Sequence, residues 1–327
     1  MNKDLRELGE EGLIGLIKRF MPIGQTSDDT AEINLGGKNL IINTDVLIED
    51  VHFSDKFSSP QEIGWKAVAS NLSDLACSGV LKNIGITIGL IAPPSTCSSW
   101  VEGVYKGMED ALKVYGGNIL GGDISRGSQK VLSITAVGER GPLRLHRNEA
   151  RPNDWLITTG PHGLSGLGLA LLLNDEIAIG TKLPESLKTK AVISHKKPIP
   201  QSKIIHKVIN CKPKNTPWRA AGTDSSDGLI EAIKGICISS QCQAVLNKNE
   251  LPTAEGWPRG KYWEDLCLFG GEDFELILSL PEEWARNLLK EIPESFLIGI
   301  IRDGKEQLSW NNGELIDLYS KKLFKHF

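Results

Sequence analysis

The sequence predicts a mixed α/β protein with two domains. Its 327 residues suggest about two domains at the usual size of roughly 150 residues each. Patterns typical of helices and of strands intermix in both halves, without the regular strand–helix rhythm of a doubly wound parallel sheet. A polar segment with two prolines, residues 140–155, separates the halves. We therefore expect a domain boundary inside it and divide the chain into residues 1–145 and 146–327.

Two helices are predicted early in the chain. Over residues 4–20, leucines, isoleucines and a phenylalanine recur near helical spacing, which predicts an amphipathic helix. The segment 59–79 has Ser59 as its N-cap, Pro60 in its first turn and Gly79 at its end. Each of these residues favours a helix terminus at its position, so both ends of this helix are predicted.

The remaining elements are shorter. A helix is expected at residues 98–117, which end in two glycines, and two more at 163–173 and 226–240, the last behind a Ser or Asp cap. Short apolar runs predict strands at 39–45, 84–92, 118–120, 131–139, 155–160, 274–280 and 296–302. Strands and helices are thus expected in both halves.

Composition narrows the possible functions. The formal net charge of −4 gives no general attraction to nucleic acid or to an anionic membrane, both of which favour basic faces. We expect no signal peptide, because the first residues include acids and their apolar residues are spaced. No run reaches the ~18 apolar residues of a membrane span. The six cysteines form no C-x-x-C pair, which argues against a zinc ribbon or a thioredoxin-like site and fits a reducing cytoplasm.

Acidic residues recur at strand ends or element junctions, beside small residues. These acids are Asp28, Asp29, Asp45, Asp123, Asp224, Asp227, Glu272 and Asp273. Asp74 differs because it lies inside the predicted helix 59–79, on a polar face with Ser70, Asn71 and Ser78. Together these carboxylates predict a site for a hard cation such as Mg²⁺, which takes oxygen ligands.

Each acid alone has a structural explanation. The Asp28–Asp29 pair could be a solvated turn, and Asp123 could lie in a Gly-Gly-Asp turn. Asp227 could cap the helix that follows it, and Asp74 could face water. Only the whole set favours metal binding.

Several common catalytic motifs are missing from the sequence. It contains no G-x-x-x-x-G-K-[ST] phosphate loop, no protein-kinase motif set and no G-x-S-x-G elbow. The glycine-rich segment 160–168, GPHGLSGLG, follows a predicted strand and suggests a dinucleotide site. The glycines of its last six residues, GLSGLG, have the order G-x-x-G-x-G and not G-x-G-x-x-G, so we disfavour this alternative.

An ordered series of motifs resembles the thiamine-monophosphate kinase family. The motifs are ELGEEGLIGLI, SDDTAEI, TDVLIEDVHF, IGWKAVASNLSDLACSG, GGDISRG, VGE, HRNEARPNDWLITTG, GLSGLGLALL, SSDGL and FGGEDFELIL. They cover residues 5 to about 280. The shorter motifs NLSDLA and GGED indicate only the superfamily, which also contains aminoimidazole ribonucleotide synthetase and selenophosphate synthetase. The full set is specific to the kinase branch.

The resemblance implies an activity. It implies ATP-dependent phosphorylation of thiamine phosphate to thiamine diphosphate, the final step of thiamine diphosphate biosynthesis, by direct in-line transfer with Mg²⁺. It also implies a cytoplasmic homodimer in which the N-terminal sheets of two subunits meet.

The resemblance also implies roles for individual residues. Positions that match the family's magnesium ligands are Asp29, Thr44, Asp45, Asp74, Asp123, Asp224 and Asp227, of which we expect Asp74 and Asp123 to be catalytic. Positions that match nucleotide contacts are Gly122, Arg147 and Ser226. Positions near thiamine phosphate are His52 and Glu272. Asp28 is expected to be a structural neighbour of Asp29 or a residue that supports the metal ligands without touching the metal.

The sequence departs from the family pattern at four places. Residues 27–29 read Ser-Asp-Asp where the family has Gly-Asp-Asp, and Asn43 stands where the family has a metal-touching serine. The His-x-Arg-Pro motif appears as His-Lys-Lys-Pro at 195–198, which keeps the charge but loses the guanidinium fork. The family's C-terminal aromatic residue could be Tyr319 or Phe324.

Two other functions are considered. The chain could be another ATP-using enzyme of the superfamily, although residues 1–24 lack the cysteine expected of a selenophosphate synthetase. It could also be a regulator that binds nucleotide or metal without catalysis. That function predicts eroded acids, whereas every carboxylate position named above is filled.

Overall fold

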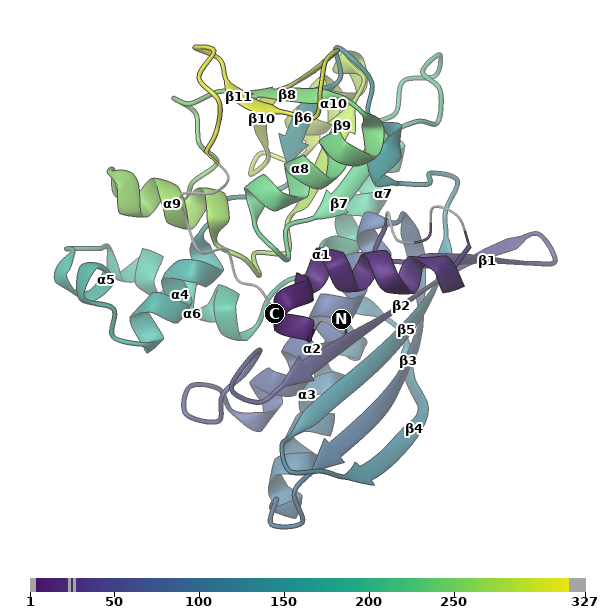
Figure 1. Cartoon of the computed structure of the whole chain (residues 1–327), viewed down its shortest axis with the longest axis vertical. Coiled ribbons are helices and arrows are strands. Elements are labelled where there is room, and N and C mark those ends of the chain that lie inside the picture. Colours follow the sequence, from purple (N-terminus) through teal and green to yellow (C-terminus); the bar gives the residue numbers. More distant parts are fainter. Residues whose placement is uncertain (1–3, 23–24, 26–27, 318–327) are drawn as a thin grey trace.

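Two β-sheets, one in each half of the chain, organise the computed structural model, which describes residues 4–22, 25 and 28–317 (Figure 1). The predicted mixed α/β class is confirmed. The chain passes from the first sheet to the second between Arg140 and Trp155, inside the segment where we expect a domain boundary. The boundary at residue 145 itself stays a proposal.

The first sheet has five strands in the order β1-β2-β5-β3-β4. Their bounds are β1 Ala31–Leu35, β2 Lys38–Ile48, β5 Val131–Arg140, β3 Val80–Ala92 and β4 Asn118–Arg126. Neighbouring strands are antiparallel except β3 and β4, which are parallel. The helices α2 (Pro60–Cys77) and α3 (Ser98–Tyr115) pack on one face, where side chains such as Ile88, Ile134 and Val104 form the core.

The opposite face of the first sheet carries exposed apolar side chains. Ile33, Leu35 and Val46 are exposed there, and the edge strand β4 is exposed along its whole length. We call this surface the outer face.

Helix α2 begins and ends where the sequence predicts. Ser59 and Glu62 form a capping box, in which each side chain accepts a hydrogen bond from the other residue's backbone. Pro60 occupies the first turn, and Gly79 follows the C-cap with a φ of 86°. The predicted polar face of α2 does not face water, because Asn71, Asp74 and Ser78 are buried. Helix α2 therefore carries polar groups into the interior.

The second sheet has six strands in the order β11-β8-β10-β6-β9-β7. Their bounds are β11 Leu308–Trp310, β8 Gln243–Leu246, β10 Phe296–Arg302, β6 Trp155–Thr158, β9 Leu276–Leu280 and β7 Ala221–Asp224. Helix α8 (Leu229–Ser240) packs on one face. Helices α7 (Ile204–Asn210) and α10 (Glu282–Glu291) pack on the other, together with the C-terminal end of α2. Helix α2 thus contacts both sheets.

Four further helices form a group beside the second sheet (Figure 1). They are α4 Leu164–Leu172, α5 Glu176–Gly180, α6 Glu185–Lys196 and α9 Lys261–Phe269. Gly168 of α4 lies so close to α6 that an added Cβ would be 2.2 Å from the Ala191 carbonyl oxygen. This glycine of the GLSGLG segment therefore serves helix packing.

The predicted N-terminal helix is found as α1 (Leu5–Ile17), but it is not continuous, because Gly9 has a non-helical backbone conformation with φ 66° and ψ 172°. A 3₁₀ turn, Lys18–Phe20, follows it. Its apolar side chains are not buried within one chain, and Phe20 is 77% exposed. Among the described residues, every helix is too short or too polar to cross a membrane.

Candidate active site

Four carboxylates from distant parts of the chain meet beside α2. Asp29 precedes β1, Asp45 lies on β2, Asp74 on α2, and Asp224 ends β7. We call these four residues the carboxylate cluster. Asp74 and Asp224 are buried, and Asp224 accepts a 2.5 Å hydrogen bond from the Ser73 hydroxyl of α2. The cluster therefore joins the two halves of the chain.

Asparagine side chains hold β2 against α2 at this point. The Asn43 side-chain nitrogen donates to Asp74 Oδ2 at 2.8 Å and to Asn71 Oδ1 at 3.2 Å. The backbone N–H of Asp45 also donates to Asn71 Oδ1, at 3.3 Å. Because alternate residues of a strand share a face, Asn43 and Asp45 both point toward α2.

The carboxylates oppose one another's ionisation. Burial, then the charges of Asp224 and Asp29, raise the pKa of Asp45 to about 6. Burial and the charge of Asp29 likewise raise the pKa of Asp224 to about 6. The pKa of Asp74 is raised well above its usual value by burial and by its three neighbours. Like charges held together out of water are stabilised by an added cation.

One arginine already neutralises part of this charge. Arg147 NH2 forms an ion pair with Asp29 Oδ2, while Nε donates to Thr223 Oγ1 at 3.1 Å. Burial disfavours the charged guanidinium, but Asp29 and Asp28 outweigh burial and raise the pKa of Arg147. Asp28 pairs instead with His146, at 3.1 Å. The two adjacent aspartates therefore have different partners.

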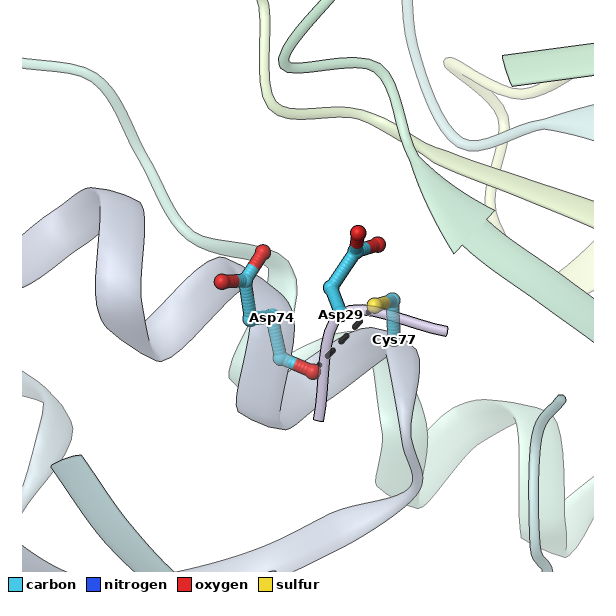
Figure 2. A group of neighbouring side chains, drawn as sticks. All are labelled: Asp29, Asp74 and Cys77. Atoms are coloured by element: carbon cyan, nitrogen blue, oxygen red, sulfur yellow. Dashed lines mark hydrogen bonds between the residues drawn. The ribbon is translucent and has the colours of Figure 1, made fainter. Parts of the chain in front are cut away.

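The donor atoms of the cluster fit a hard cation. A carboxylate oxygen from each of Asp29 and Asp74 and the Cys77 sulfur lie within 4.8 Å of one another, and Figure 2 shows the two carboxylates pointing to the same side of α2. Burial, then Asp224 and Asp74, raise the pKa of the Cys77 thiol, which leaves oxygen as the usable ligand. The buried Asn43 Oδ1 has no hydrogen-bond partner among the described residues. Carboxylate and amide oxygens are the ligand types that suit Mg²⁺.

Three residues predicted from the sequence lie apart from this cluster. Thr44 is exposed on the outer face, where its hydroxyl hydrogen-bonds that of Thr135 at 2.8 Å. Asp123 is exposed on β4 and pairs with Gly89, whose neighbours along β3 face the core, so Asp123 also belongs to the outer face. Gly122 precedes it. In the sheet order, β4 lies three strands from β2, or about 14 Å.

The turn after β7 supplies two predicted residues. Ser226 donates its hydroxyl to Asp224 Oδ1 at 2.9 Å. Asp227 is exposed, and its charge contributes to the raised pKa of Asp45. The N-cap of α8 is Gly228, with no side-chain cap, so the expected Ser or Asp cap is wrong.

His52 and Glu272 lie near one another beside Lys66 of α2. Lys66 connects them, because its Nζ lies 2.7 Å from Glu272 Oε1 and donates to the His52 carbonyl at 3.0 Å. His195 Nδ1 lies 3.5 Å from Glu272 Oε2. We call His52, Lys66, His195 and Glu272 the lysine cluster. Sequence reasoning missed Lys66, although a lysine inside a strongly apolar helix was a usable signal.

The glycine-rich segment before α4 does not present a free helix terminus. The backbone N–H groups of Gly163 and Ser165 donate to the Asp273 carboxylate at 2.6 and 2.8 Å. A protein carboxylate thus occupies the place where a dinucleotide phosphate would bind. The structure agrees with our rejection of that alternative.

A separate cavity lies elsewhere in the first half of the chain. It measures about 700 Å³ and is lined by residues such as Phe57, Thr96, Trp100 and Lys130. None of the predicted site residues lines it. The concentration of buried charge identifies the carboxylate cluster as the better candidate for catalysis.

Comparisons with known proteins decide the family. The model of the AIR synthase related protein N-terminal domain matches residues 27–140. The thiamine-monophosphate kinase of Prochlorococcus marinus is 53% identical over 323 residues, which span 99% of this chain and 97% of that protein. The chain belongs to the thiamine-monophosphate kinase family. The Synechococcus elongatus member is 40% identical over 295 residues, covering 90% of this chain and 88% of that protein.

A solved structure of this family has the same fold. The structure described as "AaThiL complexed with AMPPCP and TMP" superposes with a TM-score of 0.85 at 28% identity and covers 100% of both chains. The predicted family and fold are therefore confirmed.

Two of the departures from the family pattern lie at the two clusters. Asn43 is buried beside Asp74, and His195 lies beside Glu272. Ser27, Tyr319 and Phe324 lie outside the described residues.

Proposed function

We propose that this chain transfers the terminal phosphoryl group of ATP to thiamine phosphate, giving thiamine diphosphate and ADP. Membership of the thiamine-monophosphate kinase family supports this reaction. So does the fold shared with a relative complexed with AMPPCP, an ATP analogue, and TMP.

The carboxylate cluster is the observation that carries the proposal. The cluster holds four carboxylates, and the Arg147 guanidinium is ion-paired with one of them, Asp29. Burial and then the charges of neighbouring acids raise the pKa values of Asp45, Asp74 and Asp224. A site of this kind binds Mg²⁺ together with anionic phosphates, whereas a site for a neutral substrate has no need of such charge. We propose Asp29, Asp45, Asp74, Asp224 and Asp227 as the ligands, together with Thr44 from the family pattern, and with Asp123 contributing as described below.

The residues then have distinct tasks. Bound Mg²⁺ supplies charge neutralisation and aligns the two substrates for in-line transfer. Arg147 offers a guanidinium fork to the ATP phosphates, and Ser226 and Gly122 contact the nucleotide. His52 and Glu272 hold thiamine phosphate, whose phosphate oxygen is already ionised at neutral pH. No protein residue is needed as a general base.

One assay tests the reaction. The purified chain is incubated with MgATP and thiamine phosphate, and the products are separated by chromatography. Thiamine diphosphate with equimolar ADP supports the proposal. ADP without thiamine diphosphate favours a sister enzyme of the superfamily, and no reaction favours a binding protein.

We further propose a cytoplasmic homodimer formed through the outer face. The exposed edge strand β4 and the exposed Ile33, Leu35 and Val46 are surfaces that a second copy could cover. Asp123 lies on this face, so it would approach the partner subunit. We propose that the partner subunit's Asp123 completes each site. The six free cysteines fit a reducing compartment.

Mixing two inactive variants tests this arrangement. Asp74→Asn and Asp123→Asn are each expected to be inactive, and denatured mixtures are refolded together. If Asp123 acts across the interface, half of the sites in each mixed dimer retain both acids, and about a quarter of the wild-type activity returns. If Asp123 acts within its own chain, mixing restores nothing. Sedimentation analysis confirms that the mixed samples are dimers.

A further inference from the structure

Lys66 is a buried cation that no role assigned so far explains. Its side chain is only 7% exposed, in the middle of α2. Its Nζ lies 2.7 and 2.8 Å from the two oxygens of Glu272 and donates to the His52 carbonyl at 3.0 Å. The Lys66 ammonium group thus donates hydrogen bonds to both residues that are expected to hold thiamine phosphate.

The backbone at Glu272 is held in an unusual conformation. Its φ is 64°, a region that side-chain-bearing residues rarely adopt. Its N–H donates to the Ser226 carbonyl at 2.7 Å, and the Ser226 hydroxyl in turn donates to Asp224. Such a conformation persists only when several contacts impose it. Lys66 supplies the contact at the carboxylate end.

Lys66 is also the main charge partner of Glu272. Burial alone would raise the pKa of Glu272, but Lys66, and then His195 and His52, lower it. Burial and Lys66 lower the pKa of His195 itself to about 4, so His195 is neutral at pH 7. The other charged neighbours are Lys196, next to His195, and Asp273, next to Glu272. The constant positive charge at Glu272 therefore comes from Lys66.

Helix α2 sets the distance between the two clusters. Lys66 and Asp74 are eight residues apart on α2, which corresponds to about 12 Å along the helix axis. As part of the proposed function, we assign the phosphates to the carboxylate cluster and the heterocyclic end of the substrate to the lysine cluster. A rigid helix with both anchors keeps the two ends in register.

We propose that Lys66 is a positioning residue for thiamine phosphate. It keeps Glu272 ionised and oriented and fixes the His52 loop, so that both residues meet the ring end of the substrate. This inference rests on the proposed function, because it takes thiamine phosphate as the ligand of His52 and Glu272.

Equilibrium binding tests Lys66 without requiring turnover. The Kd of thiamine phosphate and the Kd of MgAMPPCP are measured by calorimetry for wild type, Lys66→Met and Lys66→Arg. Arg219→Met is the matched control, since it also removes the cation from a buried carboxylate, Asp154, at 2.6 Å. Thermal melting of each variant reports folding.

We expect Lys66→Met to weaken thiamine phosphate binding at least tenfold at pH 7 and to leave the MgAMPPCP Kd within about twofold. In this variant binding should improve as pH rises above 7, because burial raises the pKa of Glu272 and Lys66 no longer counteracts it. Lys66→Arg retains the charge and should bind within about threefold of wild type. Arg219→Met should lower the melting temperature without changing the thiamine phosphate Kd.

Other results separate the two proposals. If Lys66→Met melts too low to assay, Lys66→Met/Glu272→Gln removes both charges and should restore folding while binding stays weak. If the wild-type protein turns over and Lys66→Met binds thiamine phosphate as tightly as wild type does, only the role of Lys66 is overturned. If thiamine phosphate binding depends on Lys66 but the wild-type protein shows no turnover, only the proposed reaction is overturned. A wild type that does not bind thiamine phosphate overturns both.

Discussion

The pKa values of the carboxyl groups in the two clusters along α2 are shifted in opposite directions. In the carboxylate cluster, burial and like charges both raise the pKa, as for Asp224 at about 6. In the lysine cluster, Lys66 offsets the burial of Glu272, and the pKa of that carboxyl is lowered. Helix α2, where the two halves of the chain meet, thus holds both clusters. The carboxylate cluster has an excess of negative charge, whereas the charges of the lysine cluster are balanced.

This difference identifies which cluster requires an external cation. A partly buried carboxylate with its own lysine, such as Glu272, is stable as it stands, although breaking the pair would be costly. A group of carboxylates with one arginine is stabilised further when a cation binds. We therefore interpret the lysine cluster as a structural part of the substrate site and the carboxylate cluster as the metal site.

The largest effect is expected from Asp74→Asn. This change keeps the size of the side chain but removes a charge from the centre of the carboxylate cluster, so turnover should fall at least about 100-fold at saturating MgATP. The melting temperature should stay the same or rise, because like-charge repulsion is relieved. Asp110→Asn on α3, which changes an exposed aspartate paired with Lys106, is the control and should leave turnover unaltered. Unchanged turnover in Asp74→Asn at saturating Mg²⁺ would remove this residue from the mechanism.

A second prediction compares the pH dependence of stability in EDTA. Asp224 has a folded pKa near 6, above its usual 3.8, so the folded protein binds this proton more tightly than the unfolded chain. Its contribution to stability is therefore present below about pH 4 and is lost as pH rises to about 6. Glu272 has the opposite sign: its lowered pKa contributes stability at neutral pH that is lost on acidification.

Melting curves between about pH 2 and 8 measure both contributions. Relative to wild type, Asp224→Asn should become more stable as pH rises from about 4 through 6. Glu272→Gln should instead become less stable as pH rises from the acid range to about 4.5, and the difference should then stay constant. Saturating Mg²⁺ should raise the wild-type melting temperature by about 3 °C or more above pH 6, and this gain should be smaller in Asp224→Asn. Parallel pH curves for wild type and Asp224→Asn would contradict an excess of charge in the cluster.

Local signals explain which parts of the fold were predicted. The ends of α2 depend on Ser59, Pro60, Glu62 and Gly79, all within or next to the helix, and these signals needed no tertiary information. Strand β9 was equally clear as an apolar run. Short strands such as β8 and β11 lack such signals and exist because β10 and its neighbours offer hydrogen-bond partners.

The sequence predicted the chemical character of the site more fully than the positions of its residues. The acids beside small residues indicated cation binding, and period-two alternation could have shown that Thr44 points away from Asn43 and Asp45. The sheet order that separates Asp123 from Asp45 arises from long-range pairing. Likewise, Asp273 caps the start of α4 from about 110 residues away in the sequence. Such contacts cannot be deduced from spacing along one chain.

The smallest effect is expected from Arg147→Lys, and it sharpens the contrast with Lys66→Arg. Arg147 uses two different nitrogens, NH2 toward Asp29 and Nε toward Thr223, and a lysine has only one. If the guanidinium fork matters, Arg147→Lys should raise the KM for MgATP about tenfold while kcat changes less than about threefold. If charge alone matters here, as we propose at Lys66, the KM should stay near the wild-type value. Steady-state kinetics with varied MgATP at saturating thiamine phosphate separates these outcomes, because the fork acts on the nucleotide and not on the rings.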